Sequence, residues 1–90
     1  MEESTNQPTA GVARPFTPGE EAVGITFNPA NREDVAVVKK LCADLFDIVE
    51  KSVPAEDGTI PTARKRKMRD SALEAIITAQ MWAVKVITLK

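Results

Sequence analysis

Apolar residues recur at helical spacing in two long stretches of the chain, and this pattern predicts two amphipathic helices. In the first stretch, spacings of three and four residues persist over residues 35–49. The stripe consists of Val35, Val38, Cys42, Leu45 and Val49, and it is widened by Leu41, Phe46 and Ile48. Asn28 or Asn31 can cap the start of this helix, and it is expected to end near Ser52 because Pro54 follows.

The second helix is expected to run from Thr62 to about Thr88, a length of roughly 40 Å. Its C-terminal half, residues 72–87, is apolar around most of its girth, so it must be covered on several sides. The connection between the helices is short and turn-rich, which favours an antiparallel arrangement. The predicted fold class is therefore all-α: an antiparallel hairpin of two long helices that is assembled as a helical homo-oligomer.

The chain is expected to divide into two parts. Residues 1–26 contain prolines and glycines without a period, which indicates a flexible or extended N-terminal arm. Residues 27–90 form the helical oligomerising domain. A folded part this small is marginal alone and gains stability from partner chains.

Composition excludes several classes of chemistry. The chain has no histidine and one cysteine, Cys42, so neither an internal disulfide nor a zinc cage is expected. Without the usual general base, and with no glycine-rich phosphate loop, we expect neither an enzyme nor a cofactor. The same lack of histidine and cysteine ligands means that we expect no metal. Because no long apolar run and no signal-peptide pattern is present, we expect no membrane span and a cytoplasmic location.

The basic segment from Arg64 to Arg69 is the feature hardest to explain as ordinary surface. Residues 1–61 carry eleven acids and five bases, whereas residues 62–90 carry two acids and seven bases. The segment lies at a helix start, where the macrodipole disfavours cations. Arg64, Arg66 and Lys67 are therefore candidate ligands of a phosphate group. The alternative is a solvated helix start balanced by acids of a neighbouring chain.

A second basic pair, Lys39-Lys40, lies in the middle of the first long helix. Flanking apolar residues require one lysine to lean toward the apolar boundary, where its stem can lie along a subunit interface. Alternatively, the pair faces a ligand pocket between subunits, with Phe27 as an aromatic platform for a base. We expect Trp82, within the most apolar helix, to belong to the core rather than to a ligand site.

Two segments carry a resemblance to a known family. They are the run Gln80-Met81-Trp82-Ala83-Val84-Lys85-Val86-Ile87-Thr88, and Phe27-Asn28-Pro29 followed by Val38-Lys39-Lys40-Leu41. Across about residues 24–90, the chain resembles the phage anti-CBASS sponges, small proteins that bind the cyclic oligonucleotide signals of bacterial immunity.

The resemblance implies an all-helical homohexamer in the host bacterial cytoplasm that sequesters cyclic dinucleotides, such as cyclic GMP-AMP, between subunits. Separate pockets near the three-fold axes would hold cyclic trinucleotides. By position, Phe27 and Lys39 would serve the dinucleotide, although the family's aromatic residue is often a tyrosine and this chain has none. Arg64, Arg66 or Lys67 would serve the trinucleotide.

Two other functions are compatible with the same residues. A nucleic-acid-binding accessory protein would use the basic helix start, although a net charge of −1 disfavours it. A structural phage assembly oligomer would bind no ligand, and its basic cluster would be solvated surface.

Overall fold

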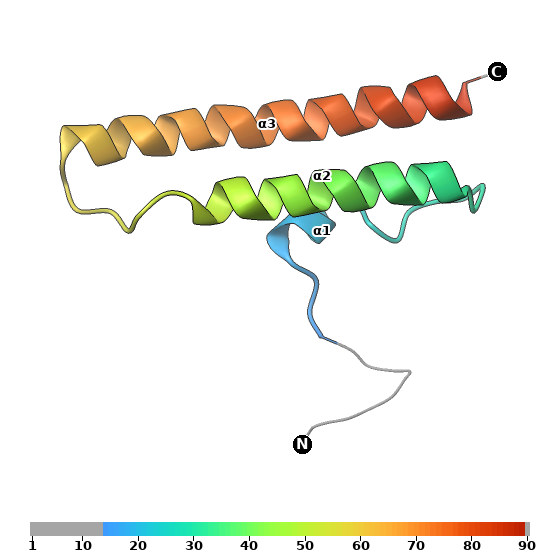
Figure 1. Ribbon diagram of the computed structural model, residues 1–90, viewed down its shortest axis with the longest axis horizontal. Coiled ribbons are helices and arrows are strands. Elements are labelled where there is room, and N and C mark those ends of the chain that lie inside the picture. The colour runs from blue at the N-terminus through green and yellow to red at the C-terminus, as the bar shows by residue number, and fades with distance from the viewer. Residues whose placement is uncertain (1–13, 90) are drawn as a thin grey trace.

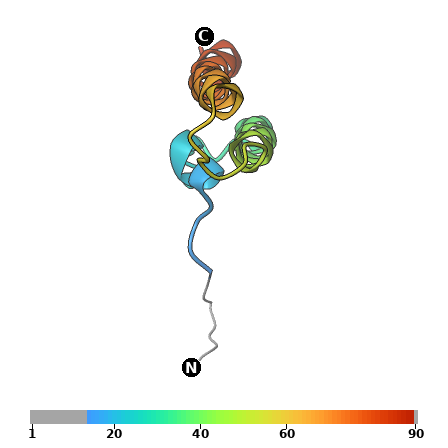
Figure 2. The same cartoon turned by 90° about the vertical axis from the view of Figure 1, so that its left-hand side faces the viewer.

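The computed structural model describes residues 14–89, and all regular structure in that range is helical. Helix α1 spans Pro18–Val23, α2 spans Glu33–Lys51 and α3 spans Ile60–Thr88. The two long helices lie side by side, with α1 against α2 (Figures 1 and 2). The predicted all-helical class is thereby confirmed.

Helix α1 lies within the segment that the sequence analysis expected to be a flexible or extended arm, so that prediction is wrong for residues 18–23. The helix forms because both of its ends are capped. The Thr17 side chain accepts a hydrogen bond from the Glu20 N–H while the Glu20 carboxylate accepts one from the Thr17 N–H, a capping box. Gly24 ends the helix in the left-handed conformation. Residues 1–13 of the expected arm lie outside the described residues.

Helix α2 begins without a side-chain cap, contrary to the expectation that Asn28 or Asn31 would supply one. Its N-cap residue is Arg32. The Asn28 amide instead donates to the Arg32 carbonyl oxygen and accepts from the Arg32 N–H, while Asn31 adopts a positive φ of 52°. The two asparagines therefore shape the turn before α2. The helix ends at Lys51, as expected from the following proline.

Helix α3 begins two residues earlier than predicted and ends at the predicted residue. Thr59 is its cap: the Thr59 hydroxyl accepts a hydrogen bond from the Thr62 N–H, and Pro61 occupies the first turn, where a missing N–H costs nothing. With 29 residues, the helix is about 43 Å long.

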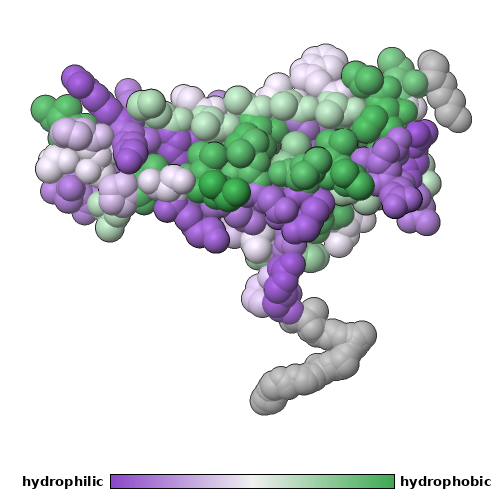
Figure 3. Space-filling model, viewed as in Figure 1, coloured by the Kyte–Doolittle hydropathy of each residue, from purple (hydrophilic) through white to green (hydrophobic). Residues whose placement is uncertain are grey.

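The core of the described chain is small. Its buried apolar residues are Val23, Val35, Ala43, Phe46 and Ile76. Twelve large apolar residues between 16 and 89 are exposed. They include Trp82, which is 64% exposed, so the expectation that it belongs to the core does not hold within one chain. Apolar surface follows the two long helices on the face in Figure 3.

Candidate functional site

A cavity of ≈ 290 Å³ lies where the turn after α1 meets the start of α2 and the end of α3. Two of the residues expected to bind a dinucleotide, Phe27 and Lys39, line it together. The other lining residues are apolar or uncharged: Asn28, Pro29, Ala30, Val35, Val84 and Thr88. The sequence analysis did not foresee these additional wall residues, because three separate segments supply them.

Lys39 is the charged group of this cavity. The residue is only 4% exposed. Its Nζ donates hydrogen bonds to the backbone carbonyl oxygens of Phe27 at 2.6 Å and of Gly24 at 2.9 Å. An ammonium carries three N–H donors, so these bonds leave one for a further acceptor. Lys39 is therefore the lysine of the Lys39-Lys40 pair that leans inward.

Burial lowers the pKa of the Lys39 ammonium from its ordinary value, since desolvation disfavours the charged form. The two carbonyl dipoles offset part of that cost, but no carboxylate forms an ion pair with Lys39 among the described residues. An anion entering the cavity would find a partly desolvated cation. Such a cation gains more from a charged acceptor than an exposed lysine does.

Phe27 supplies the aromatic surface. It is 70% exposed, and its ring centroid lies 5.4 Å from the Lys39 Nζ, within range of a cation–π interaction. The backbone and the ring of Phe27 are thus both held near the same ammonium. The exposed part of the ring can take a stacked planar group.

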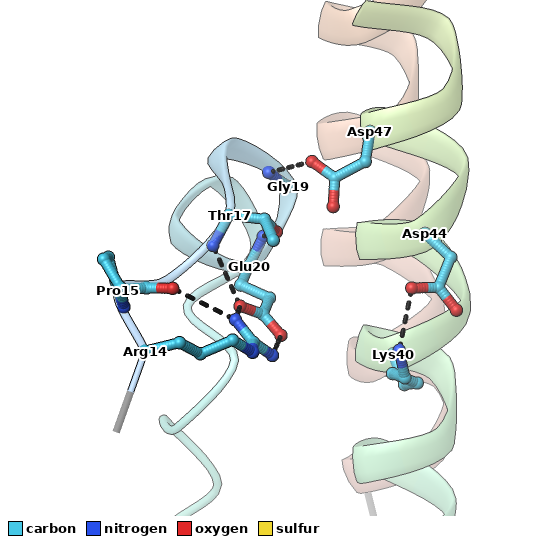
Figure 4. A network of polar contacts seen from close by, with 8 residues as sticks. All are labelled: Arg14, Pro15, Thr17, Gly19, Glu20, Lys40, Asp44 and Asp47. Carbon is cyan, nitrogen blue, oxygen red and sulfur yellow. Dashed lines mark hydrogen bonds and ion pairs between the residues drawn. The ribbon is translucent and has the colours of Figure 1, made fainter. Parts of the chain in front are cut away.

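Helix α1 positions this turn by docking on α2. The Gly19 N–H donates a 2.8 Å hydrogen bond to Asp47 Oδ1, which holds the start of α1 (Figure 4). Gly19 packs against the backbone of Ala43, where a side chain would collide. Lys39, Ala43 and Asp47 are spaced by four residues and form one stripe of α2, which we call the docking stripe. Lys39 bonds to the Gly24 carbonyl oxygen at the C-terminal end of α1, and Asp47 accepts from the Gly19 N–H at its N-terminal end.

Arg14 and Glu20 form a second restraint on α1. The Arg14 guanidinium donates two 2.7 Å hydrogen bonds to the Glu20 carboxylate, a bidentate pair (Figure 4). Together with the Thr17 N–H, Arg14 lowers the pKa of the Glu20 carboxyl to about 2. Sequence reasoning missed this pair, although the spacing Thr17-x-x-Glu20 is a recognisable capping signature.

Lys40 lies apart from the cavity. It is exposed, and its Nζ forms a 2.8 Å ion pair with Asp44 one helical turn away (Figure 4). Hydrogen bonding to Asp44 raises the pKa of Lys40. The structure therefore joins Lys39 with Phe27 but does not join Lys40 with them.

The basic start of α3 lies about 25 Å along the helix from the cavity residue Val84. Arg64 and Lys67 are exposed, and Arg66 lies 3.7 Å from Glu56 in the preceding loop. A separate groove of ≈ 250 Å³ lies at this end, and its basic residues are Lys65 and Arg69. The cations that line this groove, Lys65 and Arg69, are therefore sequence neighbours of the predicted phosphate ligands Arg64, Arg66 and Lys67.

Two further hollows lie on the surface. One, of ≈ 580 Å³, is open to solvent beside Val37, and two of its three charged residues, Arg32 and Asp34, pair with each other at 2.8 Å. The other, of ≈ 230 Å³, is lined by Thr78, Met81, Trp82 and Lys85 on the exposed side of α3. Neither combines an aromatic ring with a buried charge.

No helix of the described chain is both long and apolar enough to cross a membrane. Within residues 14–89, no cluster of three or more His, Cys, Asp or Glu side chains is arranged to hold a metal ion. Comparisons with protein-family models, with curated proteins and with solved structures found no match.

Proposed function

We propose that this chain is a non-enzymatic sponge encoded by a phage. It binds cyclic di- and trinucleotide immune signals, such as cyclic GMP-AMP, without cleaving them, and so inhibits CBASS defence in the host bacterial cytoplasm. The observation that carries this proposal is the cavity in which the open ring of Phe27 lies beside the buried ammonium of Lys39.

The chemistry of the cavity suits one nucleotide unit. A base stacks on an exposed aromatic ring whatever its identity, and this contact is worth about 1–3 kcal/mol. The remaining N–H of Lys39 can donate to a phosphate oxygen, and the charge-assisted bond offsets the cost of burying the ammonium. A cyclic dinucleotide has two bases and two phosphates, so two copies of the cavity would be needed to hold it.

Self-association of the helical hairpin is supported by the imbalance between core and surface. Five apolar residues of the described chain are buried, whereas twelve large ones are exposed. Burying a large apolar side chain contributes about 1.5–3 kcal/mol, so covering even a few of them would drive assembly. We propose a homohexamer, in which the cavities of different copies, and their basic helix starts, would come together.

The basic start of α3 supports a second, phosphate-binding role for trinucleotides. Arg64, Arg66 and Lys67 follow the first turn of α3, and a cluster of guanidinium and ammonium groups attracts phosphate. A nucleic acid could bind to the same cations. Titration with both a DNA duplex and cyclic nucleotides distinguishes the two functions.

Isothermal titration of the full chain with a panel of cyclic di- and trinucleotides and with a short DNA duplex tests the proposal. Submicromolar binding of a cyclic nucleotide is expected. Denaturing the protein should then release the ligand chemically intact, as judged by chromatography and mass.

Three results would overturn the proposal. Recovery of a linearised or hydrolysed nucleotide would show an enzyme. Salt-dependent binding of the duplex alone would favour the nucleic-acid accessory protein. The absence of heat with every ligand would favour a structural assembly protein.

A further inference from the structure

Helix α3 carries an apolar stripe whose middle and C-terminal part α2 leaves exposed. Its positions alternate by four and three residues, the spacing that one partner helix needs for a coiled-coil seam. We call the stripe the alanine seam, and it consists of Met68, Ala72, Ala75, Ala79, Trp82 and Val86. Met68, Trp82 and Val86 are 70%, 64% and 78% exposed, Ala75 and Ala79 are exposed, and Ala72 is half-buried.

Small side chains occupy the middle of the seam, and larger ones lie toward both ends. The middle, from Ala72 to Ala79, is made of alanines, Met68 precedes it, and Trp82 and Val86 follow it. A reversed copy of the helix, centred near Thr78 and Ala79, would set Trp82 against Ala75 and Val86 close to Ala72 of the other copy. A parallel copy would instead set Trp82 against Trp82 and leave the alanines facing one another across a gap, and poor filling of this kind is destabilising.

Charge favours the same reversed direction. The basic segment 64–69 occupies the second and third turns of α3. In the reversed pair, Arg69 of each copy lies beside the last turn of the other α3, where cations are favourable. The reversal also brings Lys85 of each copy toward Glu74 of the other. A parallel pair would place the two basic segments side by side.

We propose that the alanine seam binds a second copy of this chain, with the two α3 helices antiparallel about a two-fold axis near Thr78 and Ala79. Such an interface is isologous, since each copy contributes the same patch. It deepens the self-association in the proposed function and rests on that part of it alone. The cavity that holds Phe27 and Lys39 uses other α3 positions, Val84 and Thr88, so a wrong interface and a wrong dinucleotide site can be told apart.

Cysteine cross-linking of the full chain in a Cys42→Ser background tests the direction of pairing. Ala79→Cys, close to the axis, should cross-link to itself with a bis-maleimide of about 10 Å reach. Met68→Cys should not cross-link to itself, because the two cysteines would lie about 30 Å apart along the helix pair. A mixture of Met68→Cys and Val86→Cys proteins should give the mixed product. Self-cross-linking of Met68→Cys, or its absence for Ala79→Cys, would overturn the antiparallel pair.

Sedimentation analysis tests whether the seam holds the copies together. Trp82→Ala should raise the dissociation constant by about 100-fold, because a large anchor is lost from both copies. Met81→Ala is the matched control: Met81 is a neighbour with 63% exposure but lies off the seam, and its replacement should change the constant by less than about threefold. Circular dichroism checks that both variants stay helical. Equal effects of the two substitutions, or none from Trp82→Ala, would refute the interface without bearing on ligand binding.

Discussion

Gly19 and Ala43 lie in such close contact that a Cβ at position 19 would collide with the Ala43 carbonyl oxygen. This contact brings the backbones of α1 and α2 close together. It allows the Gly19 N–H to reach Asp47. The turn that carries Phe27 follows directly after α1, so its position depends on how closely α1 docks.

Gly19→Ala should therefore lower the free energy of unfolding by about 1–3 kcal/mol, because α1 must move away from α2 to admit the methyl group. Urea denaturation at one fixed protein concentration measures the change. Glu21→Ala, at an exposed position of the same helix, is the control. Equal stability of the two variants would show that α1 does not dock as described.

Glu20 should make stability depend on acid. Its carboxyl pKa is lowered from 4.5 to about 2 by Arg14 and the Thr17 N–H, so the folded protein binds this proton less readily than the unfolded chain. The contribution is present above pH 4.5 and disappears as the pH falls toward 2.

Denaturation of the wild type and of Glu20→Gln from pH 6 to pH 2 measures that contribution as a difference. The wild type should be the more stable protein at pH 6, and the gap should close toward pH 2. Asp34 and Asp57 also have lowered pKa values, but both proteins retain them, so their effect cancels. A gap independent of pH would contradict the Arg14–Glu20 pair.

Lys39→Met should destabilise the protein although methionine fills the space of the lysine stem. The substitution leaves the carbonyl oxygens of Gly24 and Phe27 without their donor, at a cost of about 1–3 kcal/mol. Lys40→Met removes only an exposed ion pair with Asp44 and should change stability by less than about 1 kcal/mol. If thermal unfolding ranks the two variants the other way, Lys39 does not hold the turn.

Phe27→Ala should weaken binding of a cyclic dinucleotide by roughly 5- to 150-fold, the loss of one base-stacking contact. Titration calorimetry measures it. Stability should change little, since the ring is 70% exposed. Phe16→Ala removes another exposed ring, one that does not line the cavity, and should leave binding unchanged. Equal losses in both variants would exclude the cavity as the binding site.

The two proposed sites should respond separately to charge. Lys39→Ala should weaken dinucleotides by at least about tenfold and spare trinucleotides, because one charge-assisted hydrogen bond is lost. Reversal of Arg66 and Lys67 to glutamate should do the opposite, because the two positions lie at the far end of α3. Should both proteins remain assembled in sedimentation and lose both ligands equally, the assignment of two pockets is wrong.

The long helices could be predicted from the sequence because their signals are local and repeated. Spacings of three and four and the position of Pro54 after α2 each act within a few residues, whereas the start of α3 was placed at Thr62 and the cap is Thr59. Helix α1 was missed because it has only six residues, which begin with Pro18 and Gly19. Its capping signature was visible, but its docking on α2 uses Asp47, 28 residues beyond Gly19.

The candidate site was predictable in its residue types and not in its geometry. Phe27 and Lys39 were selected together, and they do line one cavity. No pattern indicates that a lysine will be buried by bonding to two backbone carbonyls, since carbonyl groups carry no sequence signal. The same holds for Asn28, which could have capped a helix but bonds to the backbone of Arg32 instead.

The docking stripe also has a consequence for the order of folding. Every bond that holds α1 and the Phe27 turn to α2 joins residues between 19 and 47, so none of these bonds involves α3. Forming them closes loops of at most 28 residues, and the entropy cost of closing a loop grows only slowly with its length. We expect residues 14–51 to begin folding while α3 is still in the ribosome. Val84 and Thr88 of α3 then complete the wall of the cavity.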